Sequence, residues 1–138
     1  MDLKSFVGTN VGPYEEEASA EKLRRFATAI GATPRSEAVP TYLTVCRKGE
    51  FDLLQKMGVP LTQILHGEQQ YEFLAPIHPG DHLTYTTAVI HCIEKKMRQG
   101  AMSVLTLETE IRTGGGPAAR ARTVLLCQGG GQSGGTSA

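Results

Sequence analysis

The stretch His-Pro-Gly-Asp-His at residues 78–82 superficially resembles a set of metal ligands. Two histidines four residues apart can bind one metal ion when they share a face of a helix. Pro79 and Gly80 prevent a helix between them. We therefore predict a surface turn, in which the Asp81 carboxylate accepts hydrogen bonds from backbone amides of its own turn. No metal site is expected in this sequence.

A second pair of charged residues, Arg120 and Arg122, lies within a β-favouring stretch near the C-terminal end. Residues two apart in a strand share one face, so the two guanidinium groups could meet the phosphates of a ligand together. Alternating charged residues are also ordinary on an exposed sheet edge. We favour the exposed edge.

The composition excludes several classes of partner. The chain has 138 residues, 14 basic and 14 acidic side chains and a formal net charge of zero, so nucleic acid and anionic membranes are not favoured. No apolar run approaches the roughly 18 residues of a membrane span, and the N-terminus has no signal pattern. The three cysteines, Cys46, Cys92 and Cys127, are far apart, which favours reduced thiols in a cytoplasmic protein.

The pattern along the chain predicts one α+β domain. Ser19 can cap a helix whose apolar residues at 23, 26, 27 and 30 form one stripe before Gly31. A second helix is expected at 50–57, with Phe51, Leu54 and Met57 on its apolar face. Strands are expected at 70–74, 82–95, 101–112 and 118–127, with a hairpin at 113–117. The long strands must twist and curl, and we expect an antiparallel sheet wrapped around the first helix.

The chain divides into a domain at 1–127 and a tail at 128–138. The tail, Gln-Gly-Gly-Gly-Gln-Ser-Gly-Gly-Thr-Ser-Ala, is rich in glycine and serine and offers little to bury. We expect it to be flexible.

Several motifs together resemble one family. The helix Leu-Arg-Arg-Phe-Ala-Thr-Ala-Ile-Gly at 23–31 is followed by a proline-containing loop at 32–36. Two further motifs come next, Val-Pro-Thr-Tyr at 39–42 and Leu-His-Gly-Glu-Gln at 65–69. Downstream come Phe-x-x-Pro-x-x-Pro-Gly-Asp-x-Leu at 73–83 and Glu-Lys-Lys at 94–96. In this order they resemble the MaoC-like and FAS1-like dehydratases of N-terminal type. The resemblance covers about residues 6–127 and implies a hot-dog fold and action on acyl-CoA or acyl-carrier-protein thioesters.

The same resemblance implies a missing catalytic pair. In these dehydratases an Asp and a His lie in a Gly-Asp-x-Asn-Pro-x-His motif after the helix, whereas residues 32–36 here read Ala-Thr-Pro-Arg-Ser. Adding or removing water at an enoyl thioester needs a group that moves a proton, and His with a carboxylate serves this best. Glu37 and His66 remain an alternative pair. We expect no catalytic residue here, and a dyad supplied by a partner chain.

The resemblance also suggests what this chain contributes. Tyr42, His66 and Gly67 are candidate substrate-binding residues that would line the acyl-thioester tunnel or the seam between subunits, although His66 could also be a structural histidine at a helix end. The expected assembly is a homodimer, or a heterodimer with a dyad-bearing hot-dog subunit, without a cofactor.

Two other functions stay open. One is a stand-alone acyl-CoA-binding module without catalysis. The other is a hot-dog thioesterase, which would need its own carboxylate or histidine on the helix. The helix at 23–31 provides neither.

Overall fold

The computed structural model describes residues 3–29, 31, 46–98 and 100–128. Within these ranges two α-helices and two short 3₁₀ helices accompany five strands: η1 Leu3–Phe6, β1 Asn10–Ala18, α1 Ala20–Ala29, α2 Lys48–Lys56, η3 Leu61–Gln63, β2 Ile64–Phe73, β3 Asp81–Met97, β4 Gly100–Thr113 and β5 Gly116–Gln128. The strands form one antiparallel sheet in the order β1-β3-β4-β5-β2. The predicted α+β class is confirmed, whereas Tyr42, Glu37 and nearly all of the tail lie outside the described residues.

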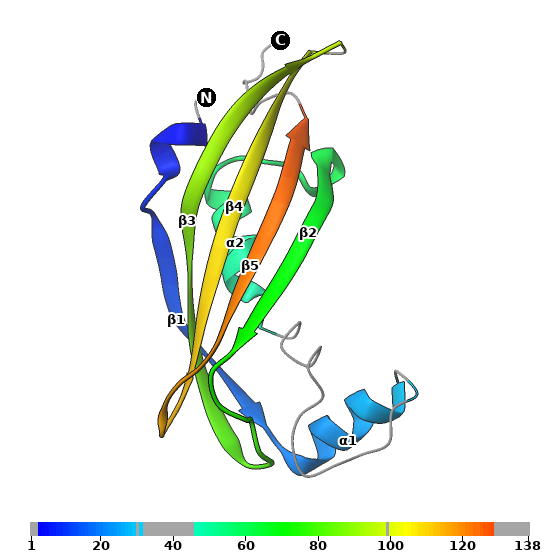
Figure 1. Ribbon diagram of the computed structural model, residues 1–138, viewed down its shortest axis with the longest axis vertical. Coiled ribbons are helices and arrows are strands. Elements are labelled where there is room, and N and C mark those ends of the chain that lie inside the picture. The colour runs from blue at the N-terminus through cyan, green and yellow to red at the C-terminus, as the bar shows by residue number, and fades with distance from the viewer. Residues whose placement is uncertain (1–2, 30, 32–45, 99, 129–138) are drawn as a thin grey trace.

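The sheet curls around α2, and not around the helix that we expected at its centre. Figure 1 shows α2 lying against one face of the sheet, while α1 lies beyond one end of it. The Ser19 cap is present, because its Oγ accepts a hydrogen bond from the Lys22 amide at 3.2 Å. The apolar stripe is only partly core, since Leu23 and Ala27 are buried but Phe26 is half-buried. Periodicity identified an apolar helix face but not the surface that covers it.

The helix α2 turns a different face to the sheet than its spacing suggested. Leu53, Leu54 and Met57 are buried, whereas Phe51 is 46% exposed and lies under the Arg47 guanidinium at 5.2 Å from the ring centroid. Gly49 is what allows the helix to approach β3. A Cβ at that position would come within 2.2 Å of the Thr87 hydroxyl.

The inner face of the sheet, which faces α2, matches the predicted alternation. Leu105, Leu107 and Ile111 of β4 are almost fully buried, and the hairpin between β4 and β5 forms as expected. The strand predicted at 70–74 is longer than expected and begins at Ile64. This extension places residues 66 and 67 on a strand instead of on a helix end or loop.

Because α1 lies beyond one end of the sheet, we expect its apolar side chains to contribute less to stability than those of α2. Phe26→Ala should cost about 1–2 kcal/mol, because the ring is only half-buried and full burial would make the loss about 3–5 kcal/mol. Leu53→Ala, in the fully buried α2 core, should cost about 2–5 kcal/mol. Urea denaturation of both variants checks this. Equal losses would mean that α1 is as central to the core as α2.

Candidate functional site

The candidate substrate-binding residues of the described chain lie on a sheet edge. His66 and Gly67 belong to β2, whose one side pairs with β5 and whose other side has no strand partner among the described residues. Both residues are exposed. The register with β5 shifts between His66 and Glu68, so Gly67 occupies a bulge. A bulge at an edge redirects neighbouring side chains and is common beside functional sites.

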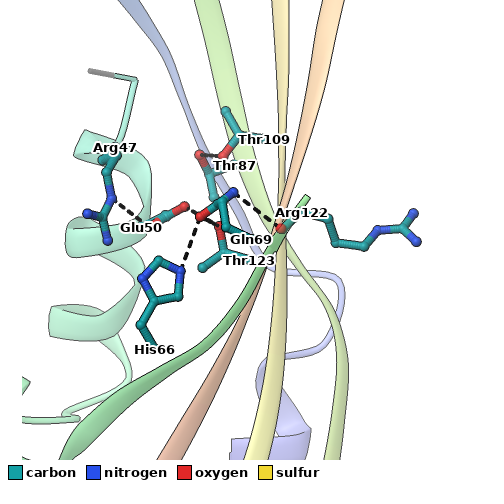
Figure 2. A network of polar contacts seen from close by, with 8 residues as sticks. All are labelled: Arg47, Glu50, His66, Gln69, Thr87, Thr109, Arg122 and Thr123. Carbon is teal, nitrogen blue, oxygen red and sulfur yellow. Dashed lines mark hydrogen bonds and ion pairs between the residues drawn. The ribbon is translucent and has the colours of Figure 1, made fainter. Parts of the chain in front are cut away.

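A chain of polar contacts connects this edge to the interior. Figure 2 shows His66 beside Gln69, Gln69 beside Thr123, and Thr123 beside Glu50 of α2. The His66 Nε2 lies 3.2 Å from the Gln69 Oε1, which lies 3.0 Å from the Thr123 hydroxyl. That hydroxyl lies 2.6 Å from the Glu50 Oε2, and Arg47 Nε donates to Glu50 Oε1 at 3.2 Å.

The network determines which nitrogen of His66 carries the proton. Gln69 Nε2 donates to the backbone carbonyl of Arg122 at 3.2 Å, which leaves the Gln69 Oε1 facing the imidazole. An amide oxygen can only accept, so the His66 Nε2 must be the donor. In the neutral ring, Nδ1 is then the nitrogen able to accept a proton or a hydrogen bond.

Glu50 is the residue of this site that the sequence analysis missed. It is 3% exposed, which is rare for a carboxylate, and such groups persist in proteins when hydrogen bonds satisfy them. Its Thr123 and Arg47 partners lie 73 and 3 residues away in sequence, so nothing local marks it. Thr87 and Thr109, whose hydroxyls lie 2.9 Å apart, add a buried polar pair beside it (Figure 2). Threonine at alternate, otherwise apolar strand positions was the available signal.

A second polar contact joins α2 to β1. The Tyr14 hydroxyl donates to Asp52 Oδ2 at 2.6 Å, and its ring lies 5.3 Å from that of Tyr85. Burial first, and then the hydrogen bond to the Asp52 carboxylate, raises the pKa of Tyr14 from 10.0 to about 12. The protonated phenol is therefore the form that the fold prefers.

This shift predicts a loss of stability in alkali. A group whose pKa is higher in the folded than in the unfolded chain stabilises the fold fully below the unfolded pKa, here pH 10, and loses that contribution as pH rises toward 12. The difference in unfolding free energy between the wild-type chain and Tyr14→Phe should therefore shrink between pH 10 and pH 12. Guanidinium titrations across that range measure it. A constant difference would contradict the assigned contact.

The other ionisable groups have structural roles. In the 78–82 turn, Asp81 Oδ2 accepts from the His78 amide at 2.8 Å, as predicted. The three cysteines are buried thiols. Burial raises the pKa of Cys46 to about 12 and of Cys127 to about 11, so both of these thiols stay protonated near neutral pH. The described residues hold no group of histidine, cysteine and carboxylate side chains that could bind a metal.

The two strand arginines are paired with carboxylates. Arg122 donates to Glu108 at 2.7 Å, and Arg120 donates to Glu72 at 2.9 Å. Both lie on the outer face of the sheet, which is turned away from α2, over a shallow hollow of about 150 Å³. The expectation of a sheet edge is wrong, because β5 lies between β4 and β2. With glutamates beside both guanidinium groups, this hollow is not arranged for phosphate.

Solved structures define the class of this fold. The chain superposes on a MaoC-like dehydratase with a TM-score of 0.71 over 91% of this chain and 43% of that one, at 17% identity. It matches a chain of the HadBC (3R)-hydroxyacyl-ACP dehydratase complex from Mycobacterium tuberculosis with a TM-score of 0.67 over 83% and 91%, at 19% identity. A protein from Staphylococcus aureus solved with CoA gives 0.59 over 82% and 66%, at 12% identity. The fold is therefore the hot-dog fold, as predicted.

The family follows from the sequence match. Residues 5–121 match the model of the FAS1-like dehydratase domain region. The chain belongs to this family. It is also 28% identical to a UPF0336 protein of Saccharopolyspora erythraea over 91% of both chains, and 29% identical to one of Streptomyces griseus over 62% of this chain and 70% of that one. The family resemblance predicted from the motifs is confirmed.

None of the described helices is long and apolar enough to cross a membrane.

Proposed function

We propose that this chain is the acyl-thioester-binding subunit of an (R)-3-hydroxyacyl dehydratase or enoyl hydratase whose catalytic Asp and His come from a partner hot-dog chain. The observation that carries the proposal is a dehydratase-family domain with Ala-Thr-Pro-Arg-Ser at 32–36, where the family resemblance places an Asp and a His. The proposal concerns acyl-CoA or acyl-carrier-protein thioesters.

The strand β2 is the edge better suited to a partner. The other edge, β1, contains Pro13, which lacks an amide hydrogen, a register shift before Tyr14, and glutamates at 15–17. Proline, bulges and charges are the features that protect an edge strand from pairing. The strand β2 also has a bulge, at Gly67, and two glutamates, but its ten residues contain no proline, and Phe73 at its end is 48% exposed. Pairing through β2 would continue the sheet into a second protomer.

This arrangement would place His66 and Gly67 at the seam. Gly67 lies in the edge bulge, and His66 is held by Gln69 with the Nδ1 able to accept. A thioester lying along the seam would meet these two residues, with Tyr42 as a third candidate from sequence. The roles proposed for them are binding and orientation of the substrate.

The thioesterase alternative needs a carboxylate or histidine on the central helix that can reach the substrate. We expected no carboxylate on the central helix, but that helix is α2 and carries Glu50 and Asp52. Both are engaged: Glu50 by Thr123 and Arg47, and Asp52 by Tyr14. A nucleophile or general base must reach the substrate, and a 3% exposed carboxylate held by two donors is better suited to joining helix and sheet.

Assembly through β2 can be tested directly. The chain is mixed with a hot-dog chain that carries Gly-Asp-x-Asn-Pro-x-His, first of all one encoded beside it, and sedimentation velocity follows complex formation. Phe73→Lys adds a charge to the β2 edge and should weaken the complex by roughly tenfold or more. Asn10→Lys, on the exposed β1 edge, is the matched control and should leave it unchanged. A complex that resists Phe73→Lys but is lost with Asn10→Lys would place the seam at β1.

A further inference from the structure

The outer face of the sheet carries a row of aliphatic side chains across four strands. Ile93 of β3 pairs with Val104 of β4, Val104 with Leu126 of β5, and Leu126 with Leu65 of β2. Directly paired residues of an antiparallel sheet point to the same face, so the four side chains form one continuous band. Leu65 is 63% exposed and Ile93 is 37% exposed.

Below this aliphatic row lie two rows of ordered charge. Glu108 of β4 pairs with Arg122 of β5, and Glu110 pairs with Arg120 in the next row. The Arg122 and Glu108 side chains lie 2.7 Å apart, and Arg120 lies 3.8 Å from Glu110 and 2.9 Å from Glu72 of β2, which belongs to the same row. In both rows β4 carries an acid beside the base on β5, and the second row has a further acid, Glu72, on β2.

We propose that this face is a docking surface for a second copy of the chain. The observation that selects a second copy is that the pattern is complementary to itself. The two outer faces would meet across a two-fold axis that lies between the two copies, runs parallel to the strands and stands over the gap between β4 and β5. This axis would lay β4 of one copy over β5 of the other, and β3 over β2. Glu108 of one copy would then face Arg122 of the other, and Glu110 would face Arg120 in the same way.

The remaining positions agree with the same axis. The aliphatic row would face itself in reverse order, with Ile93 over Leu65 and Val104 over Leu126. Between the aliphatic row and the charged rows, His91 pairs with Thr106, Thr106 with Val124, and Val124 with Glu68. The axis would bring His91 of one copy over Glu68 of the other. No row places two like charges opposite each other.

The surface is small, so the association should be weak on its own. Four strands about 4.8 Å apart and four rows about 7 Å apart cover roughly 15 Å by 20 Å. This is less than the roughly 800 Å² per partner of a stable interface, and we expect dissociation in the micromolar range or above. The contact is perpendicular to the plane of the sheet, so it can coexist with pairing at the β2 edge and does not depend on the proposed function.

Charge reversal distinguishes a contact between two copies from the ion pair within one chain. Sedimentation velocity from about 1 to 200 µM should show dimerisation of the wild-type chain. Glu108→Arg and Arg122→Glu should each weaken self-association by roughly tenfold or more, because each places like charges opposite each other twice. An equimolar mixture of the two variants should associate as well as the wild-type chain, although the pair within each chain is still broken.

Matched controls separate this from net charge and from edge pairing. Glu21→Arg and Arg24→Glu, both on α1, make the same changes in charge at exposed positions outside the sheet. Neither should alter self-association, and their mixture should gain nothing. A wild-type chain that stays monomeric throughout would overturn the proposal. So would self-association that both face variants retain, which would assign it to another surface, such as the β2 edge.

Discussion

Glu50→Ala should lower the free energy of unfolding by about 2–4 kcal/mol. The substitution removes a buried acceptor and leaves the Thr123 hydroxyl with only its longer, 3.0 Å contact to Gln69 in place of the 2.6 Å one to Glu50. Removing the main partner of a buried polar group costs about 1–3 kcal/mol, and breaking the ion pair with Arg47 adds to this. Arg47 is partly exposed and can turn to water, which limits its share.

A double-mutant cycle shows whether the loss comes from this contact. Thr123→Val removes the other side of the hydrogen bond and keeps the shape of the side chain. The combined Glu50→Ala and Thr123→Val variant should be more stable than the sum of the two losses predicts, because both single changes remove the same Glu50–Thr123 hydrogen bond. Glu50→Gln, which keeps an acceptor for Thr123, should cost less than Glu50→Ala. Additive losses in denaturant titrations would mean that the two side chains act independently.

The chain alone should lack hydratase activity, and mixing it with a dyad-bearing partner should produce it. General acid–base catalysis by positioned groups supplies about 10²–10⁴-fold, and the sequence offers no Asp and His at 32–36 to provide it. The expected contribution of this chain is binding. His66→Ala in the complex should therefore raise KM or change chain-length preference far more than it lowers kcat. A kcat loss of a hundredfold or more would make His66 a catalytic group.

The long strands were predictable because apolar and polar residues alternate along them, as expected for a strand with one buried and one exposed face. Leu105, Leu107 and Ile111 show this well, and all three are buried. The position of the helices was not predictable in the same way. An amphipathic stripe reports that a helix has a covered face, and both α1 and α2 have one, but the choice of α2 as the central helix depends on contacts distant in sequence. The close approach that Gly49 permits at Thr87 is such a contact.

The candidate site divides along the same line. His66 and Gly67 stood out because their motif is local, and they lie on the β2 edge. Glu50 did not, since a glutamate in the first turn of a helix is ordinary in any sequence. Its burial follows from Thr123, which is 73 residues away. The long β2 was underestimated because Gly67 interrupts its alternation with a bulge.

Crotonyl-CoA hydration by the reconstituted pair is the most direct test of the central claim. The rate is measured for this chain alone, for the partner alone, for the mixture, and for mixtures in which either the partner's dyad Asp is replaced by Asn or this chain carries Glu37→Gln or His66→Ala. The account predicts a negligible rate for this chain alone, a rate increase on mixing, and loss of activity only when the partner's dyad is removed. An ordinary enzymatic rate from this chain alone, abolished by Glu37→Gln or His66→Ala, would contradict it and show that the chain has a catalytic pair of its own.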